Sequence, residues 1–162
     1  MKLLRFETPE GPRWGRLEGQ EVIPTAGLGG PDSGEALPRS EVRLLPPAQD
    51  GKIVCVGRNY VDHISEMGHA AAGLPREPGL FLKGSNALAP SGGHLTYPSW
   101  TQELHFEGEL ALIIGQRAAQ LTPVEVPAAI LGYTCALDPP PETRNAATCS
   151  GCGPSPPTCF VR

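Results

Sequence analysis

The segment 104–115 (LHFEGELALIIG) is the stretch that most restricts what this chain can fold into. Its side chains alternate in character, as they do in a β-strand, where successive residues point to opposite faces. His105, Glu107 and Glu109 would share one face with Ala111. The other face would carry large apolar side chains, namely Leu104, Phe106, Leu110 and Leu112. We therefore expect a strand with one polar face and one face that packs in a core.

Short β-type runs separated by Gly and Pro predict further strands. We expect these strands at 2–7, 13–17, 21–24, 41–45, 52–57, 80–83 and 132–138. Residues 59–67 favour a short helix, and Thr122, Pro123 and Glu125 resemble a capping box that opens another short helix, ending at residue 130. The predicted fold class is mainly β, an α+β chain in which the helices are few and short.

Composition and charge exclude some classes of partner. The formal net charge is −4 and the pI is near 5.5, so no basic surface favours nucleic acid. No apolar run approaches the roughly 18 residues that span a bilayer, so we expect no membrane segment. Charged residues directly after Met1 interrupt any apolar region of a signal peptide. We therefore expect a cytoplasmic protein.

The chain changes character after Asp138. Three prolines follow, and the rest of the chain has no apolar period, so we expect residues 139–162 to form a disordered tail. The tail cysteines could suggest a zinc knot, but no fourth ligand is evident. The expected organisation is a small β unit with a Gly/Pro linker at 1–48, a catalytic part at 49–138, and the tail at 139–162.

Three carboxylates in this sequence are candidates for a metal site. Glu107 and Glu109 would lie about 7 Å apart at Cα on one face of their strand. Asp138 ends another predicted strand, a position where loops and sites gather. Such an all-oxygen set suits Mg²⁺, Mn²⁺ or Ca²⁺ rather than Zn²⁺. The alternative is a solvated polar face of an ordinary antiparallel strand.

His63 and Glu66 are candidates for acid–base chemistry. They lie three residues apart in the predicted helix and would project from the same side of it. A carboxylate beside an imidazole raises its basicity and fixes its tautomer, as a general base acting on water requires. The alternative is a surface histidine with an ordinary helix neighbour.

These motifs occur together and in order along the chain. They are CVGRNYVDHISEMG (55–68), EPGLFLK (77–83), ELHFEGELALIIG (103–115) and GYTCALD (132–138). This series resembles the fumarylacetoacetate hydrolase family, which includes acylpyruvate hydrolases and oxaloacetate decarboxylases. The resemblance covers residues 52–138 well and the N-terminal unit loosely.

The resemblance implies a β-roll with a Mg²⁺ or Mn²⁺ site, a small oxo-acid substrate and cleavage of a carbon–carbon bond in an acylpyruvate-like 2-oxo acid. The isomerase and decarboxylase activities of aromatic-acid catabolism are the close alternative, of the 2-hydroxyhepta-2,4-diene-1,7-dioate isomerase type. Family relatives are commonly homodimers. By the same resemblance the metal ligands would be Glu107, Glu109 and Asp138, the pair acting on water would be His63 and Glu66, and the substrate-binding residues would be Arg58, Asn59 and Lys83.

This sequence departs from the family after Asp138. Relatives continue with a pattern like D-x-[ST]-A-R-D-x-Q, whereas here PPPETR follows. Loss of one base after the Asp138 codon would convert that pattern into this tail, so we hypothesise a frameshift and an incomplete β-roll. The geometry at Asp138 would then depend on the tail. An inactive, truncated remnant is the alternative of a different class.

Overall fold

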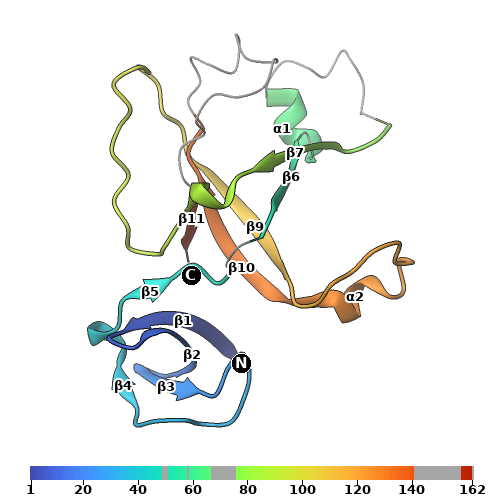
Figure 1. The fold of residues 1–162 in the computed structure, drawn as a ribbon. Coiled ribbons are helices and arrows are strands. Elements are labelled where there is room, and N and C mark those ends of the chain that lie inside the picture. The colour runs from blue at the N-terminus through green and yellow to red at the C-terminus, as the bar shows by residue number, and fades with distance from the viewer. Residues whose placement is uncertain (49–50, 58, 67–75, 141–157, 162) are drawn as a thin grey trace. The chain divides into compact units, whose positions relative to one another are not determined.

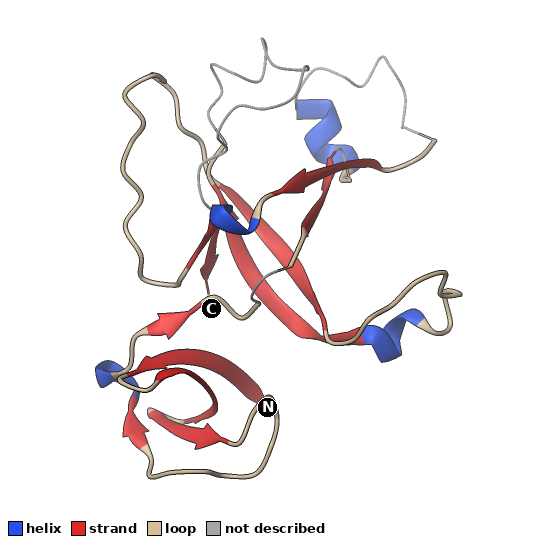
Figure 2. Ribbon diagram, in the orientation of Figure 1, coloured by secondary structure: helices blue, strands red, loops and turns tan. Residues whose placement is uncertain are grey.

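The structure is a computed structural model that describes residues 1–48, 51–57, 59–66, 76–140 and 158–161. Strands dominate these residues and the helices are short, as Figure 2 shows. The predicted mainly β fold class is confirmed. The chain divides into two compact units, which are described separately below. The first unit is Met1–Gln49 with Leu88–Arg162, and the second is Asp50–Ala87.

The first residues form a five-stranded curled sheet, drawn in blue to cyan in Figure 1. Its strands are β1 (Lys2–Thr8), β2 (Gly11–Glu18), β3 (Glu21–Thr25), β4 (Leu37–Pro38) and β5 (Leu44–Leu45). Neighbouring strands are antiparallel in the order β4-β3-β2-β1-β5. The strands predicted at 2–7, 13–17 and 21–24 are confirmed. The strand predicted at 41–45 shrinks to β5, because Arg39–Glu41 forms a 3-10 turn.

This sheet encloses a small apolar core. Leu4, Phe6, Val22 and Leu44 make up its buried cluster, and both Phe6 and Val22 are 0% exposed. Gly15 lets β2 pass close to this core. A Cβ built there would meet the Ile23 carbonyl oxygen at 2.9 Å and the Phe6 ring at 3.1 Å. The sheet thus closes over Phe6 because residue 15 has no side chain.

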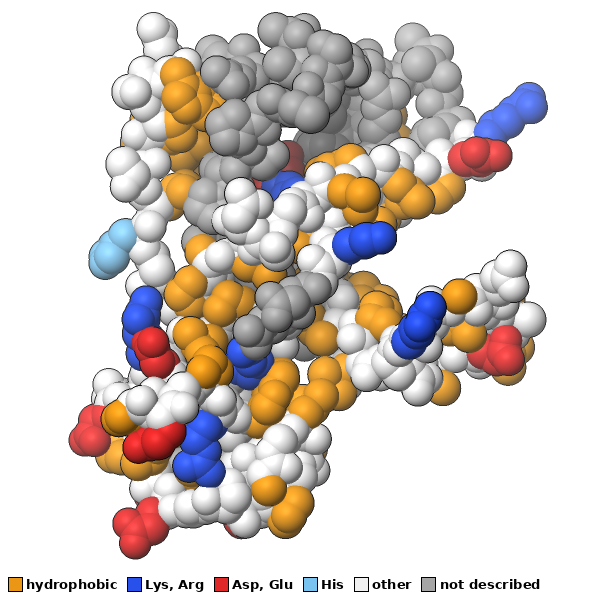
Figure 3. Space-filling model, in the orientation of Figure 1, with side chains coloured by type: hydrophobic (Ala, Val, Ile, Leu, Met, Phe, Trp, Pro, Cys, Tyr) orange, Lys and Arg blue, Asp and Glu red, His pale blue; other side chains and the backbone are white. Residues whose placement is uncertain are grey.

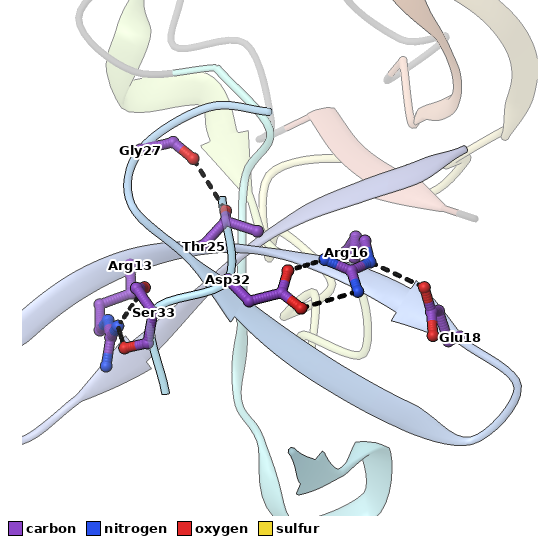
Figure 4. Close-up of polar contacts among 7 residues, drawn as sticks. All are labelled: Arg13, Arg16, Glu18, Thr25, Gly27, Asp32 and Ser33. Carbon is purple, nitrogen blue, oxygen red and sulfur yellow. Dashed lines mark hydrogen bonds and ion pairs between the residues drawn. The ribbon is translucent and has the colours of Figure 1, made fainter. Parts of the chain in front are cut away.

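Polar contacts tie the segment after β3 back to β2, as Figure 4 shows. Arg16 donates to both carboxylate oxygens of Asp32, with 3.0 Å from Nη2 to Oδ2, and its Nε lies 2.7 Å from Glu18. Arg13 Nη2 donates to the Ser33 backbone and hydroxyl oxygens, at 2.9 and 2.8 Å. The carboxylates of Glu18 and Asp32 are more than half exposed, so these ion pairs fix the course of the loop more than they add stability.

A four-stranded sheet follows in the order β8-β11-β10-β9. The strands are β8 (Leu88–Ala89), β9 (Glu107–Ile114), β10 (Ile130–Asp138) and β11 (Thr158–Val161). The two strands predicted at 104–115 and 132–138 are confirmed, with the first starting later. β11 lies in the tail that we expected to be disordered, and its four residues pair with β10 and β8. The prediction is wrong for those residues.

The apolar face of β9 does not pack in a core. Leu110 is 60% exposed, Phe106 and Leu112 are also exposed, and only Leu104 is half-buried. The core predicted for these side chains is therefore wrong. Alternation along a strand shows which residues share a face, but that face becomes a core only where a second layer covers it.

A short connection joins β9 to β10. Its helix α2 spans Val126–Ala129, shorter than predicted, and begins one turn after Thr122. The Thr122 hydroxyl and backbone N–H both donate to the Glu125 carboxylate, at 2.7 and 2.8 Å. These bonds supply the Thr122–Glu125 contact that the capping pattern predicts. They hold a turn that leads into α2.

The described residues of the second unit form a two-stranded sheet, an α-helix and a 3-10 turn at Ser85–Ala87. Strands β6 (Ile53–Gly57) and β7 (Gly79–Lys83) are antiparallel, with Ile53 opposite Lys83 and Gly57 opposite Gly79. Helix α1 spans Val61–Glu66. The strands predicted at 52–57 and 80–83 and the helix predicted within 59–67 are confirmed. In the described part of the chain, no helix has the length and apolar character needed to cross a bilayer.

Candidate metal centre

The pairing of β9 with β10 brings three acidic residues onto one face. Asp138 lies directly opposite Glu107, and Ala136 lies directly opposite Glu109. Directly opposite residues of an antiparallel pair share a face, with their Cβ atoms about 4.5–5.5 Å apart. Residues two apart in a strand share a face as well. Glu107, Glu109 and Asp138 are therefore neighbours on the sheet although 29 to 31 residues separate Asp138 from the glutamates.

Burial differs among these acidic residues. Asp138 is only 9% exposed, Glu107 is half-buried and Glu109 is exposed. Ala136, which faces Glu109, is also buried and carries a small side chain. The longer glutamates thus reach from the edge strand β9, whereas the short carboxylate of Asp138 is fixed close to the backbone of β10. A cation on this face would meet Asp138 as the innermost ligand.

The strand register continues past Asp138. The backbone N–H of His105 donates to the carbonyl oxygen of Pro140 at 3.1 Å, so these two residues stand opposite each other and share one hydrogen bond, since Pro140 has no N–H to return a second. Between them, Pro139 stands opposite Phe106 at a position whose N–H would point away from β9. The missing N–H of Pro139 therefore removes no bond to β9. The backbone pairing beyond Asp138 thus runs through Pro140, a residue of the tail on which we expected the geometry at Asp138 to depend.

The side chains of these three acidic residues do not converge on a common point. In residues 1–48, 51–57, 59–66, 76–140 and 158–161, no three His, Cys, Asp or Glu side chains are gathered as a metal ion requires. The three acidic residues offer only carboxylate oxygens as possible ligands. Carboxylate oxygens are the type of ligand that Mg²⁺ and Mn²⁺ prefer. The backbone places these donors as neighbours on one sheet face.

The other predicted site residues lie in the second unit. His63 and Glu66 fall within α1, three residues apart, and their side chains lie outside the described residues, as does Arg58. Asn59 is exposed just before α1. Lys83, the last residue of β7, is 9% exposed, which is low for a lysine. The structure thus places the three acidic residues as neighbours on one sheet face, and the roles of these five residues remain predictions.

Sequence reasoning missed Thr101. It is buried, and its hydroxyl donates to the Glu103 carbonyl oxygen at 2.8 Å and accepts from the Glu103 N–H at 3.2 Å. These local bonds fix the chain just before it enters the segment that carries Glu107. Thr101 lies six residues before β9, and a hydroxyl side chain in such a loop is the signal that could have indicated this turn.

Family models match nearly all of the described chain. Residues 52–145 match the model described as fumarylacetoacetate (FAA) hydrolase C-terminal, which is more than half of the 162 residues. The chain belongs to the fumarylacetoacetate hydrolase family. Residues 1–47 match a second model, described as Rv2993c-like, N-terminal. The family predicted from the ordered motifs is thus confirmed.

Two curated relatives illustrate the range of the family. Protein Rv2993c of Mycobacterium tuberculosis is 34% identical over 148 residues, which are 85% of this chain and 55% of the relative. The mitochondrial oxaloacetate tautomerase FAHD1 of Bos taurus is 46% identical over 86 residues, which are 53% of this chain and 38% of the relative. The chain therefore spans about half the length, or less, of these relatives.

Solved structures share the fold. A 2-hydroxyhepta-2,4-diene-1,7-dioate isomerase from Mycobacterium marinum matches with a TM-score of 0.83 and 26% identity, over 99% of this chain and 64% of the isomerase chain. A maleylpyruvate hydrolase from Sphingobium, solved with manganese(II) and pyruvate, matches with a TM-score of 0.72 and 22% identity, over 99% of this chain and 65% of the hydrolase chain. At that identity the second match shows the fold alone.

Proposed function

We propose that this chain carries the metal-binding part of a divalent-metal-dependent hydrolase or lyase that cleaves carbon–carbon bonds of acylpyruvate-like 2-oxo acids. The observation that supports it most is the β9–β10 register, which sets Asp138 opposite Glu107 with Glu109 on the same face. A solvated polar strand face, the alternative reading of the same pattern, would not require a buried Asp138 on the partner strand. The family relationship supports an enzyme, and relatives are named as hydrolases, isomerases and tautomerases.

Glu107, Glu109 and Asp138 would hold Mg²⁺ or Mn²⁺. Such a cation, once bound, supplies positive charge that polarises the carbonyl of a chelated 2-oxo acid and stabilises the developing enolate. The manganese(II) and pyruvate in the maleylpyruvate hydrolase structure are a cation and a 2-oxo acid of these kinds. The three carboxylates would hold that cation on the face of the β9–β10 pair.

His63 and Glu66 would act on the water that attacks the substrate. Both lie on α1 three residues apart, a spacing at which positions of a helix adjoin. His63 would accept a proton from water, and Glu66 would orient the imidazole. Arg58, Asn59 and Lys83 would contact the substrate's polar groups; no more specific role is proposed for them.

Isomerase, tautomerase or decarboxylase chemistry is the second candidate. Relatives named as an oxaloacetate tautomerase and as a 2-hydroxyhepta-2,4-diene-1,7-dioate isomerase favour it. These reactions use the same stabilised enolate but need no attacking water. The metal carboxylates would therefore be required for both candidates, whereas the water-activating role of His63 would be required only for hydrolysis.

Purified chain, assayed with acetylpyruvate and with oxaloacetate in the presence of Mg²⁺, tests these proposals. Metal-dependent acetylpyruvate cleavage that His63→Gln removes, with metal binding retained, supports the hydrolase. Turnover of oxaloacetate alone, insensitive to His63→Gln, supports the second candidate. The variant Glu21→Gln, which changes an exposed carboxylate on β3, is the matched control.

A chain that unfolds cooperatively but turns over neither substrate would favour the inactive remnant.

The frameshift hypothesis has its own test, which is the sequence of the gene around the Asp138 codon. Family-coding sequence that resumes in the shifted frame is the expected result. An absence of the family pattern in that frame would contradict the hypothesis. The expected location is cytoplasmic, although the bovine relative is named as mitochondrial.

A further inference from the structure

Arg5 is a buried cation on the face of the N-terminal sheet that lies opposite the core. It stands between Leu4 and Phe6 in β1, and because those two side chains belong to the core, alternation sends the Arg5 side chain to the other face. Arg5 is nevertheless only 7% exposed, which is rare for an arginine. Its guanidinium carbon lies 5.6 Å from the centre of the Trp14 ring, and its Nη1 donates to the Pro46 carbonyl oxygen at 3.1 Å. These two contacts fix the position of the guanidinium.

A cavity of about 410 Å³ adjoins this arginine within the first compact unit. Small-molecule sites in proteins typically measure about 300–1,000 Å³, so the cavity has the size of a ligand site. Residues of the N-terminal sheet and of the β9–β10 pair line it, and most of them are apolar. The lining includes Arg5, Trp14, Leu45, Ile113 and Leu131. An apolar cavity with one fixed polar group is the usual form of a site for a small organic ligand.

The charge of the lining indicates the sign of the ligand. Lys2 and Arg5 line the cavity, whereas no Asp or Glu occurs among the described residues that do so. The whole chain has a formal net charge of −4, so the lining carries the opposite sign to the chain. On the face drawn in Figure 3, hydrophobic side chains lie beside Lys and Arg side chains, the same two kinds that line the cavity. A guanidinium matches the two oxygens of a carboxylate, and apolar walls suit a hydrocarbon body.

The cavity is separate from the candidate metal centre. Ile113 stands six residues after Glu107 in β9, and a strand advances about 3.3 Å per residue, so about 20 Å of strand separates the two residues. None of the three candidate metal ligands lines the cavity. A ligand held by Arg5 would therefore leave the metal centre free.

We propose that this cavity is a second binding site, which takes a small monocarboxylic acid with an apolar body. The Arg5 guanidinium binds the carboxylate, and the exposed Lys2 adds positive charge beside it. The apolar body lies against Ile113 and Leu131. The site uses no metal and none of the residues of the proposed catalytic function, so the two proposals stand or fall separately.

Titration with a carboxylate and with its uncharged counterpart tests the proposal. The probe is 2-naphthoate, added to the full 162-residue chain in the presence of EDTA and followed by calorimetry and NMR. We expect one site per chain and a shift of the indole N–H resonance of Trp14. The amide 2-naphthamide has the same apolar body without the charge, so it should bind at least about tenfold more weakly, as expected when hydrogen bonds to a charged group are lost.

The variant Arg5→Met removes the cation and keeps a long apolar side chain. It should weaken 2-naphthoate by at least about tenfold and leave the affinity for 2-naphthamide within about threefold, a difference that a purely structural role of Arg5 would not produce. The matched control is Arg43→Met, because Arg43 is an exposed arginine that pairs with Glu7 and does not line the cavity. It should leave both affinities within about twofold.

Circular dichroism of each variant checks the fold. If Arg5→Met does not fold, the comparison of the two probes on the unaltered chain still decides the question. Three results would overturn the proposal: no saturable binding of 2-naphthoate at millimolar concentration, equal affinities for the two probes, or binding that appears only when Mn²⁺ is added. The last result would place the carboxylate at the metal centre instead.

Discussion

Asp138 stands directly across the β9–β10 pair from Glu107, on the same face of the sheet. This pairing joins two residues far apart in the sequence, and the His105–Pro140 hydrogen bond of 3.1 Å continues the same register beyond them. A one-residue slip of either strand would send one of the two carboxylates to the opposite face. The metal-binding proposal therefore depends on the register more than on any single side chain.

The turn before α2 predicts a measurable pKa. Hydrogen bonds from the Thr122 hydroxyl, and then from its backbone N–H, lower the pKa of Glu125. A lowered pKa means that the ionised carboxylate stabilises the turn above its ordinary pKa, and that this contribution is lost as pH falls through the lowered value. A carboxyl NMR titration should show Thr122→Ala moving the pKa of Glu125 upward and Thr122→Ser leaving it low. An unchanged pKa in Thr122→Ala would contradict the assignment.

The packing of β2 over the N-terminal core predicts a glycine requirement. In Gly15→Ala the new Cβ would stand 2.9 Å from the Ile23 carbonyl oxygen and 3.1 Å from Phe6 and Val22. Backbone must shift to relieve that contact, so we expect a loss of about 1–3 kcal/mol in unfolding free energy. Gly132→Ala is the control, since its Cβ meets nothing within 4 Å. Equal stability of the two variants in urea denaturation would exclude the close packing.

Truncation of Phe6 should have a larger effect. Its ring is 0% exposed at the centre of the cluster with Leu4, Val22 and Leu44. Phe6→Ala leaves a cavity in a small core, and such changes cost about 3–5 kcal/mol. The tryptophan fluorescence of Trp14 on β2 can report the unfolding of this sheet. A loss below about 1 kcal/mol would mean that this cluster is not the core of the sheet.

Sequence alone predicted much of this fold because its strands have clear ends and periods. The alternation in LHFEGELALIIG predicted which residues of β9 share a face, and Glu107 and Glu109 do lie on one side. It did not predict that the opposite face would be exposed, since burial depends on a covering layer that no periodicity encodes. Nor did it predict β11, because its four residues lie in a segment with a tail-like composition.

In the candidate site, too, the sequence predicted some features and only the structure gave the others. The sequence predicted that Asp138 ends a strand. Its position opposite Glu107 follows from a strand register that only the structure gives. The burial of Lys83 and Thr101 also came from the structure, since nothing in their local sequence marks either as buried. Long-range pairing and burial are set by tertiary contacts, which explains why local patterns could not supply them.

Binding of Mn²⁺ to the purified chain tests the central claim most directly. Electron paramagnetic resonance and calorimetry measure the affinity of the unaltered chain, of Glu107→Gln, of Asp138→Asn and of the Glu21→Gln control. We predict one Mn²⁺ per chain, an affinity reduced at least about tenfold by either site substitution, and no change in the control. Equal Mn²⁺ binding by all four proteins would contradict the metal site on the β9–β10 face.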